Sequence, residues 1–124
     1  MLTLIVGGAF SGKYGRLIEL GYAPGDIGAG FEYDAVYKLN DVIRKLTADG
    51  AQPLPYILEQ LERLERLGRP RRRGIACDEV GGGIVPLCQA ERDYREAVGR
   101  ACCLIAKKAD TVERMVCGIP QKLK

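Results

Sequence analysis

The sequence predicts a single α/β domain in which a mostly parallel sheet lies between two layers of helices. Short apolar runs of strand length alternate with longer stretches of helical periodicity along the chain. Strands that alternate with helices pair in parallel and are joined by right-handed crossovers. The 124 residues are one domain's worth of chain without an internal repeat or linker, so we expect one unit over residues 1–124.

The first elements are a buried strand and a short helix. Residues 2–6 (LTLIV) form an apolar run that stops at a glycine, which predicts a strand buried on both faces. Residues 14–20 predict a short helix that ends at Gly21. Residues 21–31 contain four glycines and a proline, so we expect a loop there, with a very short strand near residues 26–27.

The middle of the chain predicts a brief strand followed by two amphipathic helices. The strand covers residues 35–37, and the first helix covers residues 39–48, where apolar residues recur three and four apart. The second helix begins near residues 53–55, because proline suits a first turn. The expected apolar faces are Leu39, Val42, Ile43 and Leu46 in the first helix, and Leu54, Ile57, Leu58, Leu61 and Leu64 in the second.

The last third predicts a strand, a long helix and a final strand. They cover residues 74–77, 89–109 and 111–117. Lys122 and Lys124 are expected in a solvated tail, with contact to a nucleotide as the alternative. The expected inward face of the long helix is Ala90, Tyr94, Ala97, Val98, Ala101 and Ile105. Its expected surface ion pairs are Glu91–Arg95 and Arg92–Glu96.

The composition is that of an ordinary globular protein. Hydrophobic residues make up 47% and charged residues 28%, and a net charge of +3 argues by itself for neither a nucleic acid nor a membrane partner. The first apolar run is too short for a signal peptide or a membrane span, so we expect a cytoplasmic protein without membrane association. The chain has no histidine, so its chemistry must use other side chains or the backbone.

The five cysteines are an odd number and contain no C-x-x-C pair. Without histidine, their spacing predicts no zinc site. We expect them to be reduced, buried, small apolar residues, in keeping with a reducing cytoplasm. They are Cys77, Cys88, Cys102, Cys103 and Cys117.

Residues 7–14 (GGAFSGKY) nearly match the phosphate-binding motif G-x-x-x-x-G-K-[ST]. Its glycines let backbone N–H groups point at phosphate oxygens, the next helix adds positive potential, and the lysine offsets phosphate charge. A plain turn between strand and helix is the alternative. We expect ATP or GTP as ligand and Lys13 as a catalytic residue. The expected nucleotide-binding residues are Gly7, Gly8, Ala9, Phe10, Ser11, Gly12, Lys13 and Tyr14.

Tyr14 departs from the motif, in which a Ser or Thr hydroxyl holds Mg²⁺. The phenol oxygen lies a ring's length from the backbone, too far away to take the place of a Ser Oγ. We therefore expect nucleotide binding that survives in part, with the placement of Mg²⁺ weakened.

Two carboxylates, Asp78 and Glu79, follow the predicted strand 74–77. Open α/β sheets bind ligands at the carboxyl ends of their strands, where a carboxylate can hold Mg²⁺ or orient an attacking hydroxyl. We assign Asp78 as a metal ligand and Glu79 as a catalytic residue. The alternative for both is helix capping or bracing of a loop.

Several stretches of the chain carry a family resemblance. They are GGAFSGK near the start, DEVGGGIVP (78–86), ERDYREAVGR (91–100), ADTV (109–112) and CGIPQKLK (117–124). They resemble the patterns GGARSGKS, NEVGxGIVP, R-x-x-R-D-x-x-G-R, D-E-V and SGI-x-x-K-I-K of the adenosylcobinamide kinase / adenosylcobinamide-phosphate guanylyltransferase family of cobalamin biosynthesis. The match runs without a gap from Asp78 to Lys124, whereas residues 21–73 match poorly.

The resemblance implies a three-layer, RecA-like P-loop fold, a homo-oligomer and a nucleotide bound at the loop. The family phosphorylates the aminopropanol hydroxyl of a corrinoid, cobinamide, and then transfers GMP onto that phosphate by way of a histidine. The resemblance also places Glu79 on a motif position of the family.

Three departures from the family pattern bear on activity. Without histidine, a guanylyl–histidine intermediate cannot form on this chain. The segment that holds that histidine is missing, because only about sixty residues separate the loop from Asp78. The family has an acidic residue at the end of a middle strand, and residues 36–40 (VYKLN) offer only Asn40, or Asp41 beyond it, nearby. The sequence therefore predicts a shortened, nucleotide-binding relative of this family, and a kinase without guanylyltransferase activity is one form of that prediction. The alternative is a non-catalytic nucleotide-binding or regulatory subunit.

Two loops complete the sequence-based expectations. Residues 80–86 (VGGGIVP) place an apolar tip after three glycines, which suits contact with a corrinoid or a neighbouring subunit, or a tight strand-to-helix connection. Residues 71–73 are three successive arginines without an aromatic platform, so we do not expect nucleic-acid binding.

Overall fold

The structure is a computed structural model that describes residues 1–66, 72–80 and 87–124. The strands of these residues are β1 (Leu2–Gly7), β2 (Ile27–Gly28), β3 (Ala35–Val36), β4 (Arg73–Asp78), β5 (Thr111–Val116) and β6 (Ile119–Lys122). The helices are α1 (Lys13–Glu19), α2 (Leu39–Ala48), α3 (Pro53–Arg66) and α4 (Gln89–Lys108), with a short 3₁₀ helix over Pro24–Asp26.

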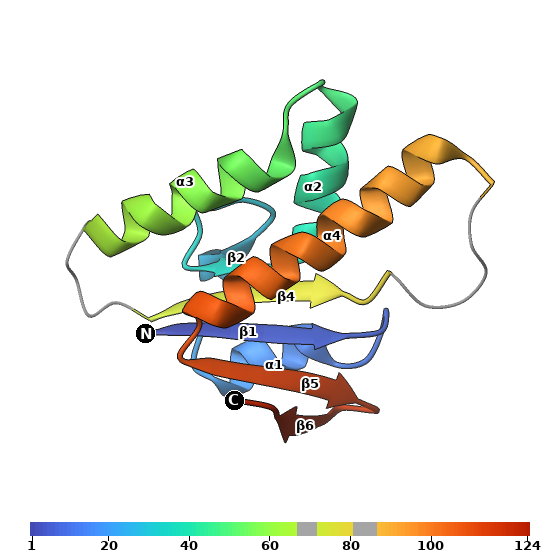
Figure 1. The fold of residues 1–124 in the computed structure, drawn as a ribbon. Coiled ribbons are helices and arrows are strands. Elements are labelled where there is room, and N and C mark those ends of the chain that lie inside the picture. Colours follow the sequence, from blue (N-terminus) through green and yellow to red (C-terminus); the bar gives the residue numbers. More distant parts are fainter. Residues whose placement is uncertain (67–71, 81–86) are drawn as a thin grey trace.

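The strands form one sheet in the order β2-β3-β4-β1-β5-β6. All neighbours pair in parallel except β5 and β6, which pair antiparallel. Helices α2, α3 and α4 lie over one face of the sheet, and α1 lies on the other (Figure 1). The α/β class and the mostly parallel sheet predicted from the sequence are therefore confirmed.

Successive residues of the central strand β1 point to opposite faces of the sheet and pack into two separate hydrophobic cores. Leu4 packs into the larger core, under α2, α3 and α4, whereas its neighbour Ile5 packs into the smaller core, under α1. Both side chains are fully buried. The apolar run at residues 2–6 is thus a strand covered on both faces, as its lack of alternation predicts.

The predicted elements agree closely with the observed ones except at the C-terminus. The helix over residues 39–48 has the predicted bounds, and most other elements differ by one or two residues. However, residues 119–122 are not a solvated tail but form the edge strand β6, which pairs with β5. Pro120 lowers the strand signal of this segment, yet an edge strand tolerates proline because no ladder partner needs its missing N–H.

The expected inward face of the long helix is confirmed for Tyr94, Val98, Ala101 and Ile105, which are buried, whereas Ala97 is half-buried and Ala90 is exposed. The first turn of α4, which contains this exposed alanine, projects beyond the ends of the strands (Figure 1). On the outer side of α4, Glu91 pairs with Arg44 of α2.

The expectation of buried cysteines is correct for Cys77 alone. Cys102 is half-buried, and Cys88, Cys103 and Cys117 are exposed. All are free thiols. Their small size allowed burial but did not require it, because a single thiol contributes little apolar area.

The described part of the basic segment is engaged within the chain. The Arg72 guanidinium contacts the Tyr22 ring and Arg73 pairs with Asp34 at 2.9 Å. Arg71 and residues 81–86, on which the nucleic-acid and interface expectations partly depend, lie outside the described residues. No helix that the structure describes is long and apolar enough to cross a membrane.

Candidate functional site

The glycine-rich segment forms the connection between β1 and α1 at the carboxyl edge of the sheet. Two of its glycines are required by their surroundings. A Cβ at Gly7 would lie 2.6 Å from Ser11 Oγ and 2.8 Å from the Met115 carbonyl oxygen. Gly12 has a φ of +97° and a Cβ there would meet Gly118 Cα at 3.0 Å. The local backbone therefore explains why glycine stands at positions 7 and 12.

The ammonium group of Lys13 lies beneath this loop. Its side chain is only 2% exposed. Nζ donates to the carbonyl oxygens of Gly7 and Gly8, at 3.1 and 2.6 Å, and to Ser11 Oγ at 3.4 Å. It also forms an ion pair with Asp78 Oδ1 at 2.8 Å. A buried cation with four oxygen neighbours is well satisfied, and oxygen atoms of a bound anion can replace some of them.

Asp78, at the end of β4, contacts both Lys13 and the first turn of α2. The parallel register pairs Gly7 with Asp78, so the loop and this carboxylate start from the same level of the sheet. Its Oδ2 accepts from Asn40 Nδ2 at 3.5 Å, and its main-chain N–H donates to Asn40 Oδ1 at 3.1 Å. The structure thus brings Lys13 and Asp78 together and adds Asn40, which the sequence did not assign.

Glu79 takes a different direction from its neighbour. Its main-chain N–H donates to the Gly7 carbonyl at 2.8 Å, but its carboxylate pairs with Arg114 of β5 at 3.1 Å. Both side chains of this pair are about half exposed. Glu79 therefore stands at the rim of the site rather than in the buried group around Lys13, and its catalytic role stays a prediction.

The side chain of Tyr14, the residue after Lys13, packs against another aromatic ring. Its ring contacts the Tyr37 ring edge to face, with centroids 5.3 Å apart, and the Lys38 ammonium lies 5.7 Å from the Tyr37 centroid. Tyr14 remains 39% exposed. The Tyr14 ring therefore has an aromatic partner where the motif has a small hydroxyl residue.

The tip of the loop is open to solvent and leans on the C-terminal hairpin. Phe10 is fully exposed and adopts a positive φ, 61°. The Ser11 carbonyl accepts the main-chain N–H of Gly118, in the turn between β5 and β6, at 2.9 Å. Ala9 and Phe10 can thus contribute to binding through their backbone, and the hairpin supports the loop from the side.

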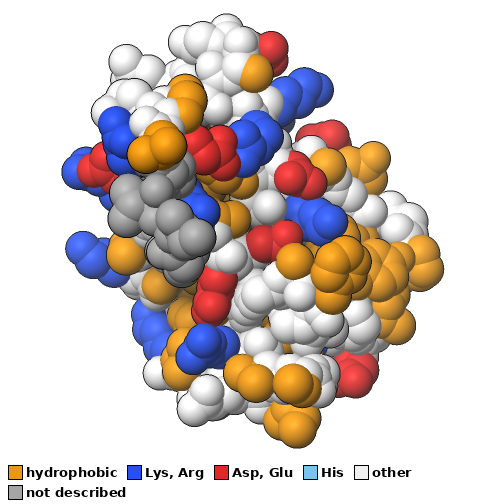
Figure 2. All heavy atoms as spheres, turned by 90° about the vertical axis from the view of Figure 1, so that its right-hand side faces the viewer, with side chains coloured by type: hydrophobic (Ala, Val, Ile, Leu, Met, Phe, Trp, Pro, Cys, Tyr) orange, Lys and Arg blue, Asp and Glu red, His pale blue; other side chains and the backbone are white. Residues whose placement is uncertain are grey.

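Figure 2 shows the face of the molecule at this carboxyl edge of the sheet. Acidic and basic side chains are intermixed near the centre of the face, and hydrophobic side chains gather to one side. A cavity of about 380 Å³ adjoins the carboxylates, lined among others by Asp78, Glu79, Val98 and Cys102. Its lining combines apolar side chains with charged ones, which suits a ligand of mixed polarity.

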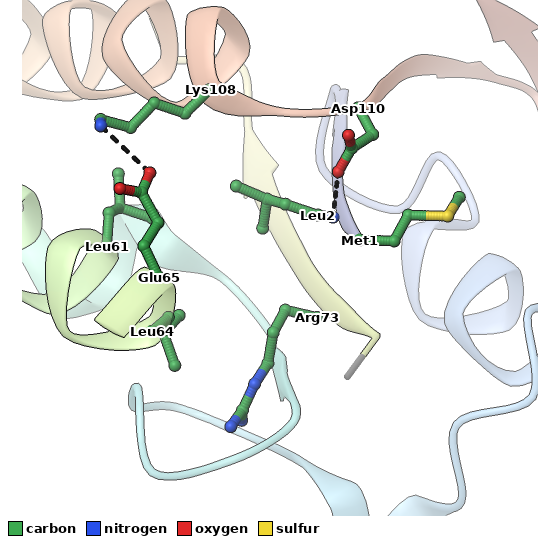
Figure 3. A pocket seen from close by; sticks show the side chains of 8 residues that line it. All are labelled: Met1, Leu2, Leu61, Leu64, Glu65, Arg73, Lys108 and Asp110. Atoms are coloured by element: carbon green, nitrogen blue, oxygen red, sulfur yellow. Dashed lines mark hydrogen bonds and ion pairs between the residues drawn. The ribbon is translucent and has the colours of Figure 1, made fainter. Parts of the chain in front are cut away.

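A second cavity lies at the amino ends of the strands (Figure 3). It measures about 180 Å³ and is crossed by the Lys108–Glu65 ion pair at 3.2 Å. Nearby, Asp110 accepts the main-chain N–H of Leu2 at 2.8 Å. Parallel α/β sheets bind ligands at the opposite edge, so this cavity is not our candidate site.

Within the described part of the chain, few side chains at the site are available to bind a metal ion. Among the described residues, no group of three or more Cys, Asp, Glu or His side chains gathers in one place. Asp78 already pairs with Lys13, and position 14 offers no short hydroxyl. Mg²⁺ often needs only one or two carboxylates because nucleotide phosphates complete its shell, so Asp78 fits that limited role.

The fold and this loop define an α/β protein in which a glycine-rich turn holds a buried lysine at the carboxyl edge of a parallel sheet. Residues 46–123 match the model of the family described as cobinamide kinase / cobinamide phosphate guanyltransferase. The chain therefore belongs to this family, as its motifs predict. Comparison with curated proteins finds no match.

The matched range includes β4, the long helix α4 and the C-terminal hairpin, but it begins after the loop at residues 7–14. Membership supports a nucleotide-binding function of the cobinamide kinase and guanyltransferase type. The assignment of the loop itself depends on its motif and on the geometry around Lys13.

Proposed function

We propose that the chain binds a nucleoside triphosphate, ATP or GTP, at residues Gly7–Tyr14. The observation that carries this proposal is the buried ammonium of Lys13, held among loop oxygens at the end of a parallel strand. Loop N–H groups at the start of α1 supply further positive potential for phosphate. On binding, phosphate oxygens replace some of the oxygens that now surround the Lys13 ammonium.

The reaction that best suits this chain is phosphoryl transfer alone. Such transfer depends mainly on positioning and electrostatic stabilisation and needs no histidine. Lys13 would offset phosphate charge, and Glu79, at the rim, would orient the acceptor hydroxyl. Asp78 would help hold Mg²⁺, which would offset the negative charge of the phosphates. Guanylyl transfer by way of a histidine is not possible on this chain.

The acceptor would be a corrinoid, cobinamide, as the family name suggests. The cavity beside Asp78 and Glu79, about 380 Å³, can admit only an arm of so large a molecule, and Asp78 in its lining pairs with Lys13. A homo-oligomer in the cytoplasm, acting in cobalamin biosynthesis, completes the proposal.

A non-catalytic, nucleotide-binding subunit is the second candidate. The observation that favours it is Tyr14, which packs on Tyr37 where the motif needs a hydroxyl for Mg²⁺. Such a subunit would bind nucleotide and transfer nothing.

One assay separates the two functions. The purified protein is incubated with Mg²⁺, cobinamide, and either ATP or GTP, and cobinamide phosphate is measured by mass spectrometry. A kinase forms the product, and a folded Lys13→Gln variant does not. Tight nucleotide binding without product favours the regulatory subunit, and absence of nucleotide binding contradicts both.

A further inference from the structure

Asn40 contacts the site from an element that the loop motif does not include. It is the second residue of α2, and although polar it is only 6% exposed. Its oxygen accepts the main-chain N–H of Asp78 at 3.1 Å, and its Nδ2 donates to Asp78 Oδ2 at 3.5 Å. This orientation of the amide is the one that chemistry demands, because the reverse would place NH₂ against N–H and oxygen against carboxylate.

Asp78 is held on both sides as a result. Its Oδ2 and its backbone face Asn40, while its Oδ1 faces the Lys13 ammonium at 2.8 Å. A carboxylate fixed at one oxygen and at its own main chain cannot turn freely. The position of Oδ1 relative to the loop is therefore set by α2.

Asn40 in turn is held from the outer layer of helices. The Tyr94 side chain, on α4, lies close to Asn40: burial raises the pKa of the Tyr94 phenol, and the neighbouring Arg44 and Asn40 side chains partly offset that rise. The Arg44 guanidinium lies 3.8 Å from the Tyr94 ring centroid and makes a bidentate pair with Glu91 at 3.1 and 2.9 Å. A chain of polar contacts therefore runs from α4 through α2 to the lysine of the loop.

We propose that Asn40 is a positioning residue of the nucleotide site, holding the Asp78 carboxylate so that Lys13 can exchange it for phosphate. Two anions, the carboxylate and the phosphate, compete for one ammonium. Their repulsion stays small only if the carboxylate cannot rotate toward the phosphates. This inference rests on the proposed function, because it needs a polyphosphate at the loop.

The decisive variant is Asn40→Asp. It keeps an oxygen for the Asp78 N–H but replaces the donor by a second carboxylate. At pH 8 its dissociation constant for inorganic tripolyphosphate, the part that ATP and GTP share, should exceed the wild-type value about tenfold or more, because negative charge is added beside an anion site.

Two further variants separate positioning from stability. Asn40→Ala removes both contacts and should weaken tripolyphosphate binding by about tenfold, the effect of one hydrogen bond to a charged group. Ile43→Val, in the same helix and fully buried, loosens the packing of α2 without touching Asp78. It should lower the melting temperature and leave the dissociation constant unchanged.

Isothermal titration calorimetry on the full chain, with folding checked by circular dichroism, decides among the outcomes. If wild-type protein binds neither tripolyphosphate nor ATP nor GTP, the proposed function and this inference both fail. If it binds them and a folded Asn40→Ala or Asn40→Asp variant binds tripolyphosphate as tightly as wild type, only the inference fails.

Discussion

At the carboxyl edge of the sheet the Lys13 side chain is 2% exposed and is surrounded by main-chain oxygens and Asp78, whereas at the amino edge Lys108 pairs with Glu65 in contact with solvent. Water solvates both charges of the Lys108–Glu65 pair, so this ion pair contributes little to the free energy of folding. The first pair has given up its hydration and depends on the protein for replacement. The difference supports the proposal that the carboxyl edge binds an anion, because oxygens of a ligand can there replace protein oxygens around a buried ammonium.

The largest effect should come from removing the buried carboxylate. Asp78→Ala leaves the Lys13 ammonium buried without its charge partner, which should lower the free energy of unfolding by about 3 kcal/mol. Asp78→Asn keeps the shape and one acceptor oxygen and should lose less. Urea denaturation measures both, and a loss below about 1 kcal/mol for the alanine variant would show that this pair resembles those of the amino edge.

Between the two edges, Glu113 on β5 provides an intermediate case. Both of its oxygens accept from the Arg16 guanidinium at 2.8 Å, and the hydrogen bond to Arg16 lowers the pKa of this carboxyl. Glu113→Gln should cost about 2 kcal/mol of stability at pH 7. Because the folded-state pKa is depressed, the contribution is present above the unfolded pKa and disappears as the pH falls through the folded value.

Unfolding curves of wild type and Glu113→Gln at pH 7 and pH 3 test this sign. The difference in unfolding free energy should be smaller at pH 3. A difference that grows on acidification would contradict the role assigned to the Arg16 contact.

A smaller effect is expected at the loop itself. Tyr14→Ser supplies the hydroxyl that the motif uses for Mg²⁺ and should raise nucleotide affinity in the presence of Mg²⁺ by about two- to tenfold, the range of one hydrogen bond. Affinity in EDTA should not rise, and Tyr14→Ala is the matched control for loss of the ring. An unchanged affinity in calorimetry with Mg²⁺ would mean that the metal is not held at this position.

The smallest effect should follow at the amino edge. Lys108→Ala breaks a pair whose Glu65 side chain is 60% exposed, so the free energy of unfolding should fall by less than about 1 kcal/mol. Nucleotide affinity should stay at the wild-type value. A change in nucleotide affinity would show that the Lys108–Glu65 pair influences the loop. The two edges of the sheet would then not be independent of each other.

Local sequence patterns predicted most of the elements because their signals are short-range. The apolar run at residues 2–6, the glycine-rich turn after it and the periodicity of residues 39–48 each define an element without reference to the rest of the chain. The strand β6 was missed because Pro120 weakens its signal and its pairing with β5 depends on position at the edge of the sheet.

The site was predicted only as far as its motif extends. Lys13 and Asp78 could be placed near each other because parallel strands end at the same edge. The contact between Asn40 and Asp78 joins residues 38 apart in sequence, and the partner of Glu79 is Arg114 on another strand. Such contacts follow from tertiary packing, which no local pattern encodes.

The turn between β5 and β6 touches the loop through the hydrogen bond from Gly118 to Ser11, and its neighbour Cys117 carries an exposed free thiol. A fluorophore attached to Cys117, after the other accessible thiols are replaced, would therefore sit beside the loop without altering any of its residues. Its emission would report the arrival of a ligand in real time. The C-terminal hairpin thus provides a natural place for a sensor.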